Sequence, residues 1–197
     1  MTTDSSNFTK HTSRNPIQRF LIDRFYEVIG GLLRPLPMKK ILDAGCGEGF
    51  TLERLRMSGI GREYLGIDIS SEALHLARTL FPKIPVRREN IYRIRVRDRS
   101  FDAVICSEVL EHLQHPFVAL AEIRRITKRY VLLTVPWEPW FRITNFFLGK
   151  YPKTLGNHPG HLNHWSRVMF IRLVERAGFH ILRTRVSFPW IIVLAER

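Results

Sequence analysis

Residues 39–49 read KKILDAGCGEG, and this stretch decides how the rest of the chain is organised. An apolar run ends in Asp43, glycines follow at positions 45, 47 and 49, and a helical pattern begins at Phe50. We therefore predict a strand, a tight loop and the start of a helix. Outward-pointing backbone N–H groups and the helix dipole favour negative charge in such a loop, and bare glycine backbone lets a ligand approach closely.

The spacing of the glycines separates this loop from a related one. It reads G-x-G-x-G after an acidic residue, whereas dinucleotide folds that bind a pyrophosphate carry G-x-G-x-x-G. A carboxylate just before the glycines, here Asp43, suits a ligand that carries a cation. The stretch resembles motif I of class I S-adenosylmethionine (SAM)-dependent methyltransferases, whose cofactor bears an ammonium and a sulfonium group. The resemblance implies SAM as the cofactor.

A second acid stands at the end of the next predicted strand, residues 63–69. Asp68 follows Asp43 by 25 positions, and Ser70 is the expected cap of a helix over residues 71–80. An acid at this place can accept hydrogen bonds from both hydroxyls of a ribose. Because NAD-binding folds use the same device, Asp68 indicates an adenosine ligand without choosing between the two cofactors.

Residues 100–113 closely resemble the segment that follows the fourth strand in the same methyltransferases. In that family an acidic residue eleven positions before the Phe of the Phe-Asp pair contacts the adenine amino group, and here Asn90 holds that position. Its amide oxygen can accept the same hydrogen bond, but the charge is lost. The resemblance assigns the cofactor to Asp43, Gly45, Cys46, Gly47, Gly49, Asp68, Ile69, Asn90, Ile91, Ser107 and Glu108.

The order of the predicted elements indicates the fold. Strands and helices alternate over residues 39–135, and strands at 179–188 and 190–195 form a terminal hairpin. We predict an α/β fold, a Rossmann-like doubly wound, mostly parallel seven-stranded sheet with an antiparallel terminal strand. Residues 1–14 are expected to be a flexible tail and residues 15–197 a single methyltransferase domain. That domain begins with a helix over 15–34, for which Asn15 and Pro16 are the start signal.

Residues 137–165 form an insert after the fifth strand that is too long for a plain connection. Ligands of open α/β sheets bind outside the carboxyl ends of the strands, so we expect the acceptor of the methyl group here. The alternative is a lid that only packs aromatic residues on the sheet. The expected acceptor-binding residues are Trp137, Trp140, His161 and Trp165.

Histidines are the candidates for catalysis. His112, His161 and His164 could each serve as the general base for an acceptor with an acidic proton. No metal is predicted, since histidines by default pack or form hydrogen bonds. The alternative is a metal site of Glu108, Glu111, His112 and His161, because the segment resembles the Glu-x-x-Glu-His segment of small-RNA 2′-O-methyltransferases, which hold a divalent ion, and that of ubiquinone-pathway O-methyltransferases.

The composition of the chain indicates which classes of partner it can attract and in which setting it works. The net charge of +13 predicts attraction to phosphates, nucleic acid or anionic lipid, and arginines crowd residues 87–99 in what is either a phosphate-binding face or a solvated edge. Two cysteines cannot form a disulfide framework, which predicts a reduced, cytoplasmic setting. No apolar run approaches about 18 residues, so we expect no transmembrane segment, with peripheral membrane contact left open.

These observations predict a SAM-dependent methyltransferase that acts on a small or lipid-like acceptor. One alternative is an RNA-directed methyltransferase of the 2′-O type, with or without a metal, which the positive charge supports. Another is a non-catalytic module that binds SAM. A dehydrogenase would also bind a nucleotide, but the glycine spacing is against it.

Overall fold

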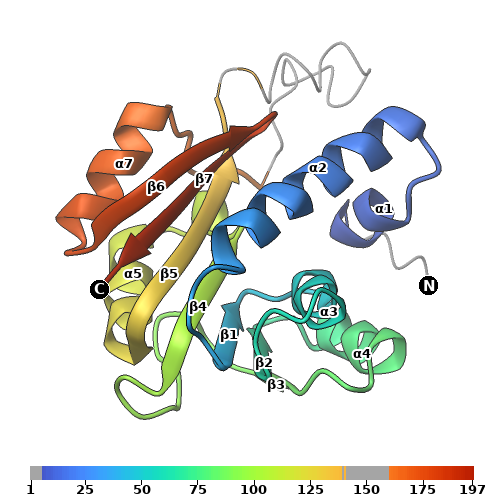
Figure 1. Ribbon diagram of the computed structural model, residues 1–197, viewed down its shortest axis with the longest axis horizontal. Coiled ribbons are helices and arrows are strands. Elements are labelled where there is room, and N and C mark those ends of the chain that lie inside the picture. Colours follow the sequence, from blue (N-terminus) through green and yellow to red (C-terminus); the bar gives the residue numbers. More distant parts are fainter. Residues whose placement is uncertain (1–5, 139, 141–159) are drawn as a thin grey trace.

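The computed structural model describes residues 6–138, 140 and 160–197 (Figure 1). Its elements in chain order are α1 (Ser6–Thr12), α2 (Pro16–Leu33), β1 (Lys40–Ala44), α3 (Phe50–Met57), β2 (Glu63–Asp68), α4 (Ser71–Leu80), β3 (Val86–Arg88), β4 (Phe101–Ser107), the 3-10 helix η1 (Leu110–His112), α5 (Pro116–Ile126), β5 (Thr127–Pro136), α7 (Arg167–Arg176), β6 (His180–Ser187) and β7 (Trp190–Glu196).

The strands form one seven-stranded sheet in the order β3-β2-β1-β4-β5-β7-β6. Strands β1 to β5 pair in parallel, and β7 runs antiparallel to both of its neighbours, β5 and β6. The predicted fold class is therefore confirmed. Strands β2 and β3 lie on one side of β1, and β4 and β5 lie on the other. The strand order therefore reverses between β1 and β4. Sheets of this kind bind ligands at the carboxyl ends of the two strands where the order reverses.

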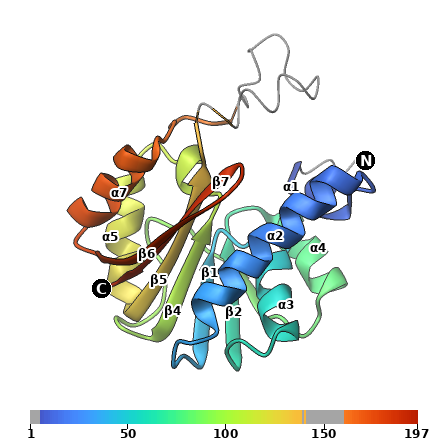
Figure 2. The same cartoon turned by 45° about the horizontal axis from the view of Figure 1, so that its top comes forward.

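Helices cover both faces of the sheet. Figure 2 shows α5 and α7 on one face and α2, α3 and α4 on the other. Successive residues of a strand point to opposite faces, and β1 follows this rule. Ile41 packs in the apolar cluster that contains Phe25 of α2, whereas Leu42 packs in the cluster that contains Leu120 of α5. Two cores thus hold the central strands and fix the edge at which they end.

The start of α2 confirms the prediction from Asn15 and Pro16. The Asn15 side chain accepts hydrogen bonds from the backbone of Ile17 and Gln18, and proline occupies the first turn. Strand β3 is short and spans only Val86–Arg88. Its last two side chains are exposed at the edge of the sheet, where little apolar burial supports a longer ladder.

The expectation of a flexible tail over residues 1–14 is wrong for residues 6–12, which form α1. The reason is tertiary contact. The ring of His11 stacks on Phe50 with centroids 4.4 Å apart, and Lys10 pairs with Glu108. A helix of 7 residues is marginal alone, so these contacts supply its stability. Residues 1–5 lie outside the described part of the chain.

Most of the insert at 137–165 also lies outside it, namely residues 139 and 141–159. Among the helices that the structure describes, none has the length and apolar character needed to cross a bilayer.

Candidate functional site

A cavity of about 1120 Å³ lies at the carboxyl ends of β1, β2 and β4. Asp43, Asp68 and Ser107, at or near the ends of these strands, all line it. Helices α1 and α2 contribute Lys10 and Tyr26 to its wall. Because pockets for one drug-sized ligand span roughly 300–1,000 Å³, this cavity is large enough for a cofactor together with an acceptor.

The glycine loop is fixed to the end of β2. The backbone amides of Gly45 and Cys46 both donate to the carbonyl of Ile67, at 2.8 and 2.9 Å. Gly45 has a φ of 86°, and a Cβ atom there would lie 2.3 Å from Cγ2 of Val109. This position therefore admits only glycine.

Asp68 joins the loop to β2. One carboxylate oxygen accepts from the Gly47 amide at 2.9 Å and the other from the Ser70 amide at 2.8 Å. Ser70 also caps α4, as the sequence predicted. Since each oxygen keeps a further acceptor site, the carboxylate is held in place while it can still bind hydroxyl groups.

Asp43 is a buried acid near the carboxyl end of β1. It is 1% exposed, and its Oδ1 receives no hydrogen bond from any residue that the structure describes. Burial, and then the charge of Asp68, raise the pKa of Asp43 to about 8. A cation in the cavity would satisfy this carboxyl, and the ammonium of SAM is such a group. The residues present thus fit the implied cofactor.

The loop after β3 forms another wall, with Asn90, Ile91 and Tyr92 lining the cavity. The amide oxygen of Asn90 accepts from the backbone N–H of Tyr92 at 2.9 Å, which closes a local turn. One acceptor site of that oxygen is therefore already used, and a second remains for a ligand. Glu89, which was not predicted from the sequence, also lines the cavity.

The end of the insert is attached to η1. The backbone amides of Leu162 and Asn163 donate to the carbonyl of Glu111 at 2.8 and 3.0 Å. This attachment brings the rings of His112 and His161 to a centroid distance of 5.0 Å, and both histidines line the cavity.

These contacts create a cluster that could hold a metal ion. Side-chain ligand atoms of Glu111, His112 and His161 lie within 4.8 Å of one another. Glu111 is 1% exposed, and neither of its carboxylate oxygens accepts a hydrogen bond from another described residue. Burial, followed by the charge of Glu108, raises the pKa of Glu111 well above its ordinary value. A cation at this point would favour the ionised carboxylate.

Glu108 stands apart from that cluster. Its backbone adopts a left-handed conformation with φ of 56°, and its carboxylate pairs with Lys10 of α1. The Lys10 ammonium also lies 4.8 Å from the centre of the Trp190 ring. Burial is the largest influence on the pKa of Glu108 and would raise it, but Lys10 together with Trp190 and His11 outweighs burial, so the pKa is lowered. Glu108 is thus held ionised against the N-terminal helix.

The structure places most of the predicted site residues on the cavity wall. Every predicted cofactor residue lines it except Gly49, which precedes α3 and donates its amide to Cys46. Of the three candidate bases, His112 and His161 line the cavity and His164 does not. Nδ1 of His164 lies 3.6 Å from Oε1 of Glu138.

The three predicted acceptor tryptophans do not line the cavity as the described residues define it. Trp165 belongs to the core, where its ring lies 6.1 Å from that of Phe170. Trp137 packs against the same core, and Trp140 is 46% exposed. His161 is therefore the one member of that predicted set that reaches the cavity.

Four further residues line the cavity that were not predicted from the sequence, namely Lys10, His11, Tyr26 and Trp190. No pattern in residues 1–14 marks α1. The position of Trp190, in contrast, was predictable from the sequence. It begins the strand expected to run antiparallel, and the start of a reversed strand must lie at the carboxyl ends of its parallel neighbours.

The sheet order, the glycine loop and the two acids together define a nucleotide-binding domain of the SAM-dependent methyltransferase type. Residues 42–134 match the family model described as "Methyltransferase domain". Over these residues the chain is a class I SAM-dependent methyltransferase domain, as the resemblance indicated.

A curated relative is similar in sequence, and solved structures share the fold. A ubiquinone biosynthesis O-methyltransferase of Burkholderia vietnamiensis is 34% identical over 119 residues, which cover 58% of this chain and 47% of that protein. The chain thus spans about half the length of this curated relative. The magnesium protoporphyrin IX methyltransferase of Synechocystis PCC 6803, solved with SAH (S-adenosylhomocysteine), has the same fold at a TM-score of 0.70 and 19% identity, covering 98% of this chain and 95% of that one. A chain from the complex of the Haloferax volcanii Trm112 methyltransferase activator with a methyltransferase also has this fold. The TM-score is 0.71 at 17% identity, and the match covers 90% of this chain and 91% of that one.

Proposed function

We propose that the protein transfers a methyl group from SAM to a small or lipid-like acceptor. One observation carries this proposal, namely that a single cavity joins the glycine loop to an apolar wall. That wall is built from Leu21, Ile22 and Tyr26 of α2 together with Trp190. Aromatic and aliphatic side chains of this kind suit a hydrophobic or ring-bearing acceptor better than a phosphate backbone.

The chain's own residues bind and orient the reactants. Asp43, Gly45 and Gly47 would hold the amino acid end of the cofactor, Asp68 the ribose, and Asn90 with Ile91 the adenine. SAM, when bound, supplies an electrophilic methyl group on its sulfonium. Alignment of two reacting groups in one enclosed site can contribute several kcal/mol, roughly 7–11 in well-oriented cases.

His112 and His161 are the candidates to take a proton from the acceptor. Nδ1 of His112 lies 2.7 Å from the carbonyl oxygen of Gly160, so in the neutral ring Nδ1 carries the proton and Nε2 is the unprotonated nitrogen. The role of the insert as a cover over the acceptor stays a prediction, because most of it lies outside the described residues.

Two substitutions test the proposed acceptor site. Leu21→Asp places a charge on the apolar wall, and His161→Ala removes a candidate base. Each should lower transfer of labelled methyl from SAM by about tenfold or more while the affinity for SAH stays within about twofold. An alkylated catechol and a long-chain fatty acid serve as acceptor probes, and label in the organic phase is the expected result.

Trp140→Ala is the companion variant, since Trp140 lies in the insert and not on the cavity wall. A loss of transfer in Trp140→Ala with none in Leu21→Asp would place the acceptor under the insert instead. Label found in added RNA, and in neither probe, would overturn the proposal of a small or lipid-like acceptor.

A metal-assisted methyltransferase acting on RNA 2′-hydroxyls is the second candidate. The cluster of Glu111, His112 and His161 favours it, because a carboxylate and two imidazoles are a common ligand set for a divalent ion. In that case EDTA would abolish transfer, Mg²⁺ or Mn²⁺ would restore it, and Glu111→Gln would remove the response. Transfer that is indifferent to EDTA would leave the histidines as bases or as packing groups.

A further inference from the structure

We propose that Glu122 and Arg125 are positioning residues for recognition of the cofactor's base: from α5 they hold the loop 89–98 in the conformation that presents Asn90 and Ile91 to the adenine. The inference rests on the proposed binding of SAM. It concerns two side chains that lie outside the cavity wall and that the assignment of cofactor contacts does not include.

The loop has few bonds of its own. Besides the turn that Asn90 closes with Tyr92, an isolated bridge joins Asn90 to Arg93 and the Val96 amide donates to the carbonyl of Ile94. Arg95, whose side chain is exposed, pairs with Glu89 at 3.4 Å. Between β3 and β4 the structure assigns no helix or longer strand. A loop with so little internal structure takes its shape from its surroundings.

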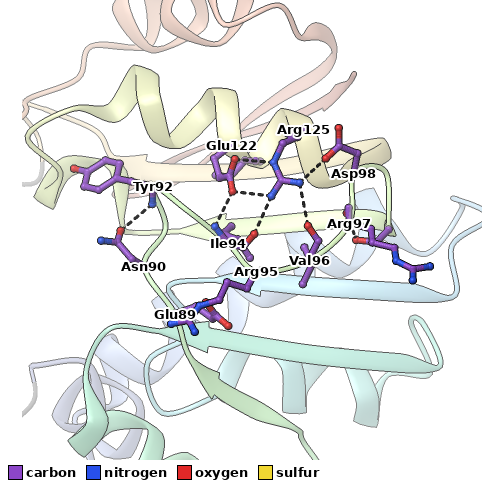
Figure 3. Close-up of polar contacts among 12 residues, drawn as sticks. Glu89, Asn90, Tyr92, Ile94, Arg95, Val96, Arg97, Asp98, Glu122 and Arg125 are labelled. Carbon is purple, nitrogen blue, oxygen red and sulfur yellow. Dashed lines mark hydrogen bonds and ion pairs between the residues drawn. The ribbon is translucent and has the colours of Figure 1, made fainter.

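Figure 3 shows that Arg125 lies at the centre of the contacts that provide this shape. Its guanidinium donates to the carbonyls of Ile94 and Val96 at 2.8 and 3.0 Å, and to the Asp98 carboxylate at 2.5 Å. Glu122 holds the guanidinium in place and accepts from the Ile94 amide at 2.6 Å. Both backbone groups of Ile94 are therefore bound by α5, and its side chain is buried at 2% exposure.

The other end of the loop is attached to the ribose acid. The Glu89 amide donates to the carbonyl of Asp68 at 3.0 Å. Between this point and Ile94 lie the residues that face the cavity, Asn90 to Tyr92. The Tyr92 hydroxyl in addition accepts from the backbone of His115 at 3.3 Å, just before α5. Contacts from both ends of α5 thus set the height and angle of the wall against which a base would lie.

Charge-assisted hydrogen bonds from one planar guanidinium to two carbonyls and two carboxylates are strong and specific in direction. Their loss would leave the loop connected to the protein and the cavity intact, but would let Asn90 and Ile91 shift. A shift of about 1 Å is enough to weaken a hydrogen bond that reads the edge of a base. The effect should therefore fall on discrimination between bases and not only on stability.

The test compares two ligands that differ at the edge of the base. SAH carries the amino group of adenine, and S-inosylhomocysteine carries a carbonyl oxygen in its place. Titration calorimetry on the wild type should show SAH binding about tenfold or more tightly than the inosine analogue. In Arg125→Gln we expect SAH to bind about tenfold more weakly and the preference to fall to about twofold.

Arg124→Gln is the matched control. It removes the same charge one residue away, from a guanidinium that donates to the carbonyl of Gly178 at 3.0 Å and not to the loop. The preference for SAH should persist in it. An unchanged preference in folded Arg125→Gln, or an equal loss in both variants, would overturn the inference even though SAH binds.

Wild-type protein that binds neither ligand would instead overturn the proposed function, and the inference with it. If Arg125→Gln does not fold, the affinities for SAH and S-inosylhomocysteine are compared in Arg125→Lys instead. A lysine keeps the charge but cannot bond both carbonyls and both carboxylates at once, so an intermediate preference is expected. A wild-type preference in folded Arg125→Lys would count against the inference.

Discussion

At the scale of single residues, the two acids of the site are prepared for their roles in different ways. Asp68 is held by two backbone amides, whereas the buried Oδ1 of Asp43 has no partner among the described residues. With a pKa near 8, Asp43 is mostly protonated at neutral pH, although its proposed task is to pair with an ammonium. Binding of the cofactor must therefore remove a proton from it.

Proton release on binding is the first prediction. Near pH 7 the uptake of SAH should release close to one proton, because the ammonium lowers the pKa of Asp43 from about 8. Calorimetry in buffers of different ionisation enthalpy measures this number directly. Asp43→Asn should bind more weakly and without proton release. Binding heats that do not depend on the buffer in the wild type would contradict the assignment.

The stability of the ligand-free protein gives a second prediction. A carboxyl whose pKa is raised from 3.8 to about 8 stabilises the fold fully below pH 3.8, and this contribution is lost as the pH rises toward 8. The free energy of unfolding should therefore fall over that range, with a slope of at most about 1.4 kcal/mol per pH unit from this group. Urea unfolding between pH 5 and 8 should show a smaller slope in Asp43→Asn. Equal slopes in the two proteins would mean that Asp43 is already ionised.

At the scale of elements, α1 closes the cavity on the side of α2. Burial lowers the pKa of His11 to about 3, so a neutral ring stacks on Phe50. Lys10 pairs with a Glu108 side chain that is 23% exposed, and its own side chain is 18% exposed. The N-terminal helix thus depends on one partly buried ion pair and on ring contacts of Phe8 and His11 with Phe50 and Tyr26.

Lys10→Met tests this dependence. Leaving the Glu108 carboxylate without its cation should lower the free energy of unfolding by about 1–3 kcal/mol at pH 7. Because the folded-state pKa of Glu108 is depressed, the difference from the wild type should vanish as the pH falls below 4.5. Arg24→Met, which breaks an exposed pair with Glu27, is the control and should cost less than about 0.5 kcal/mol. Similar losses in the two variants would show that α1 is not held by this pair.

The elements differ in how far the sequence alone determines them. The start of α2 was predictable because Asn15 and Pro16 act locally, and the central strands because their apolar runs must be buried on both faces. Helix α1 was not, since its stability comes from Phe50 and Glu108, far along the chain. The place of Trp165 in the core was not predictable either. The sequence shows that the residue is aromatic and apolar, but not which surface it contacts. The contact between His161 and η1 likewise depends on backbone hydrogen bonds that no side-chain pattern encodes.

At the scale of the whole molecule, the proposed binding of a small ligand in the cavity does not account for the net charge of +13. Arg93 and Arg97, in the loop between β3 and β4, are exposed and form no ion pair with a described residue. Such a surface attracts polyanions without selecting among them.

We therefore expect weak, non-specific binding of RNA and DNA that falls steeply with salt, and no methyl incorporation into either. Replacing Arg93 and Arg97 by Gln should reduce the slope of log affinity against log salt by up to about 1.8, since each phosphate contact contributes roughly 0.7–0.9. Filter binding at several salt concentrations measures the slope. Arg183→Gln with Arg185→Gln, on the exposed edge strand β6, is the control of equal charge. An equal reduction in the control would show that the whole surface, and not the loop, attracts nucleic acid.

The central claim is that the cavity binds SAM through the loop after β1 and the acid at the end of β2. Titration calorimetry with SAH on the wild type and on Asp68→Ala tests it most directly. We expect the wild type to bind SAH and Asp68→Ala to lose about 2–4 kcal/mol of binding free energy, because the carboxylate would bond the ribose with two charge-assisted hydrogen bonds. Asp23→Ala, which removes an exposed acid of α2, should bind as the wild type does. Equal affinity for SAH in the wild type and Asp68→Ala, or tight binding of NADH in place of SAH, would contradict it.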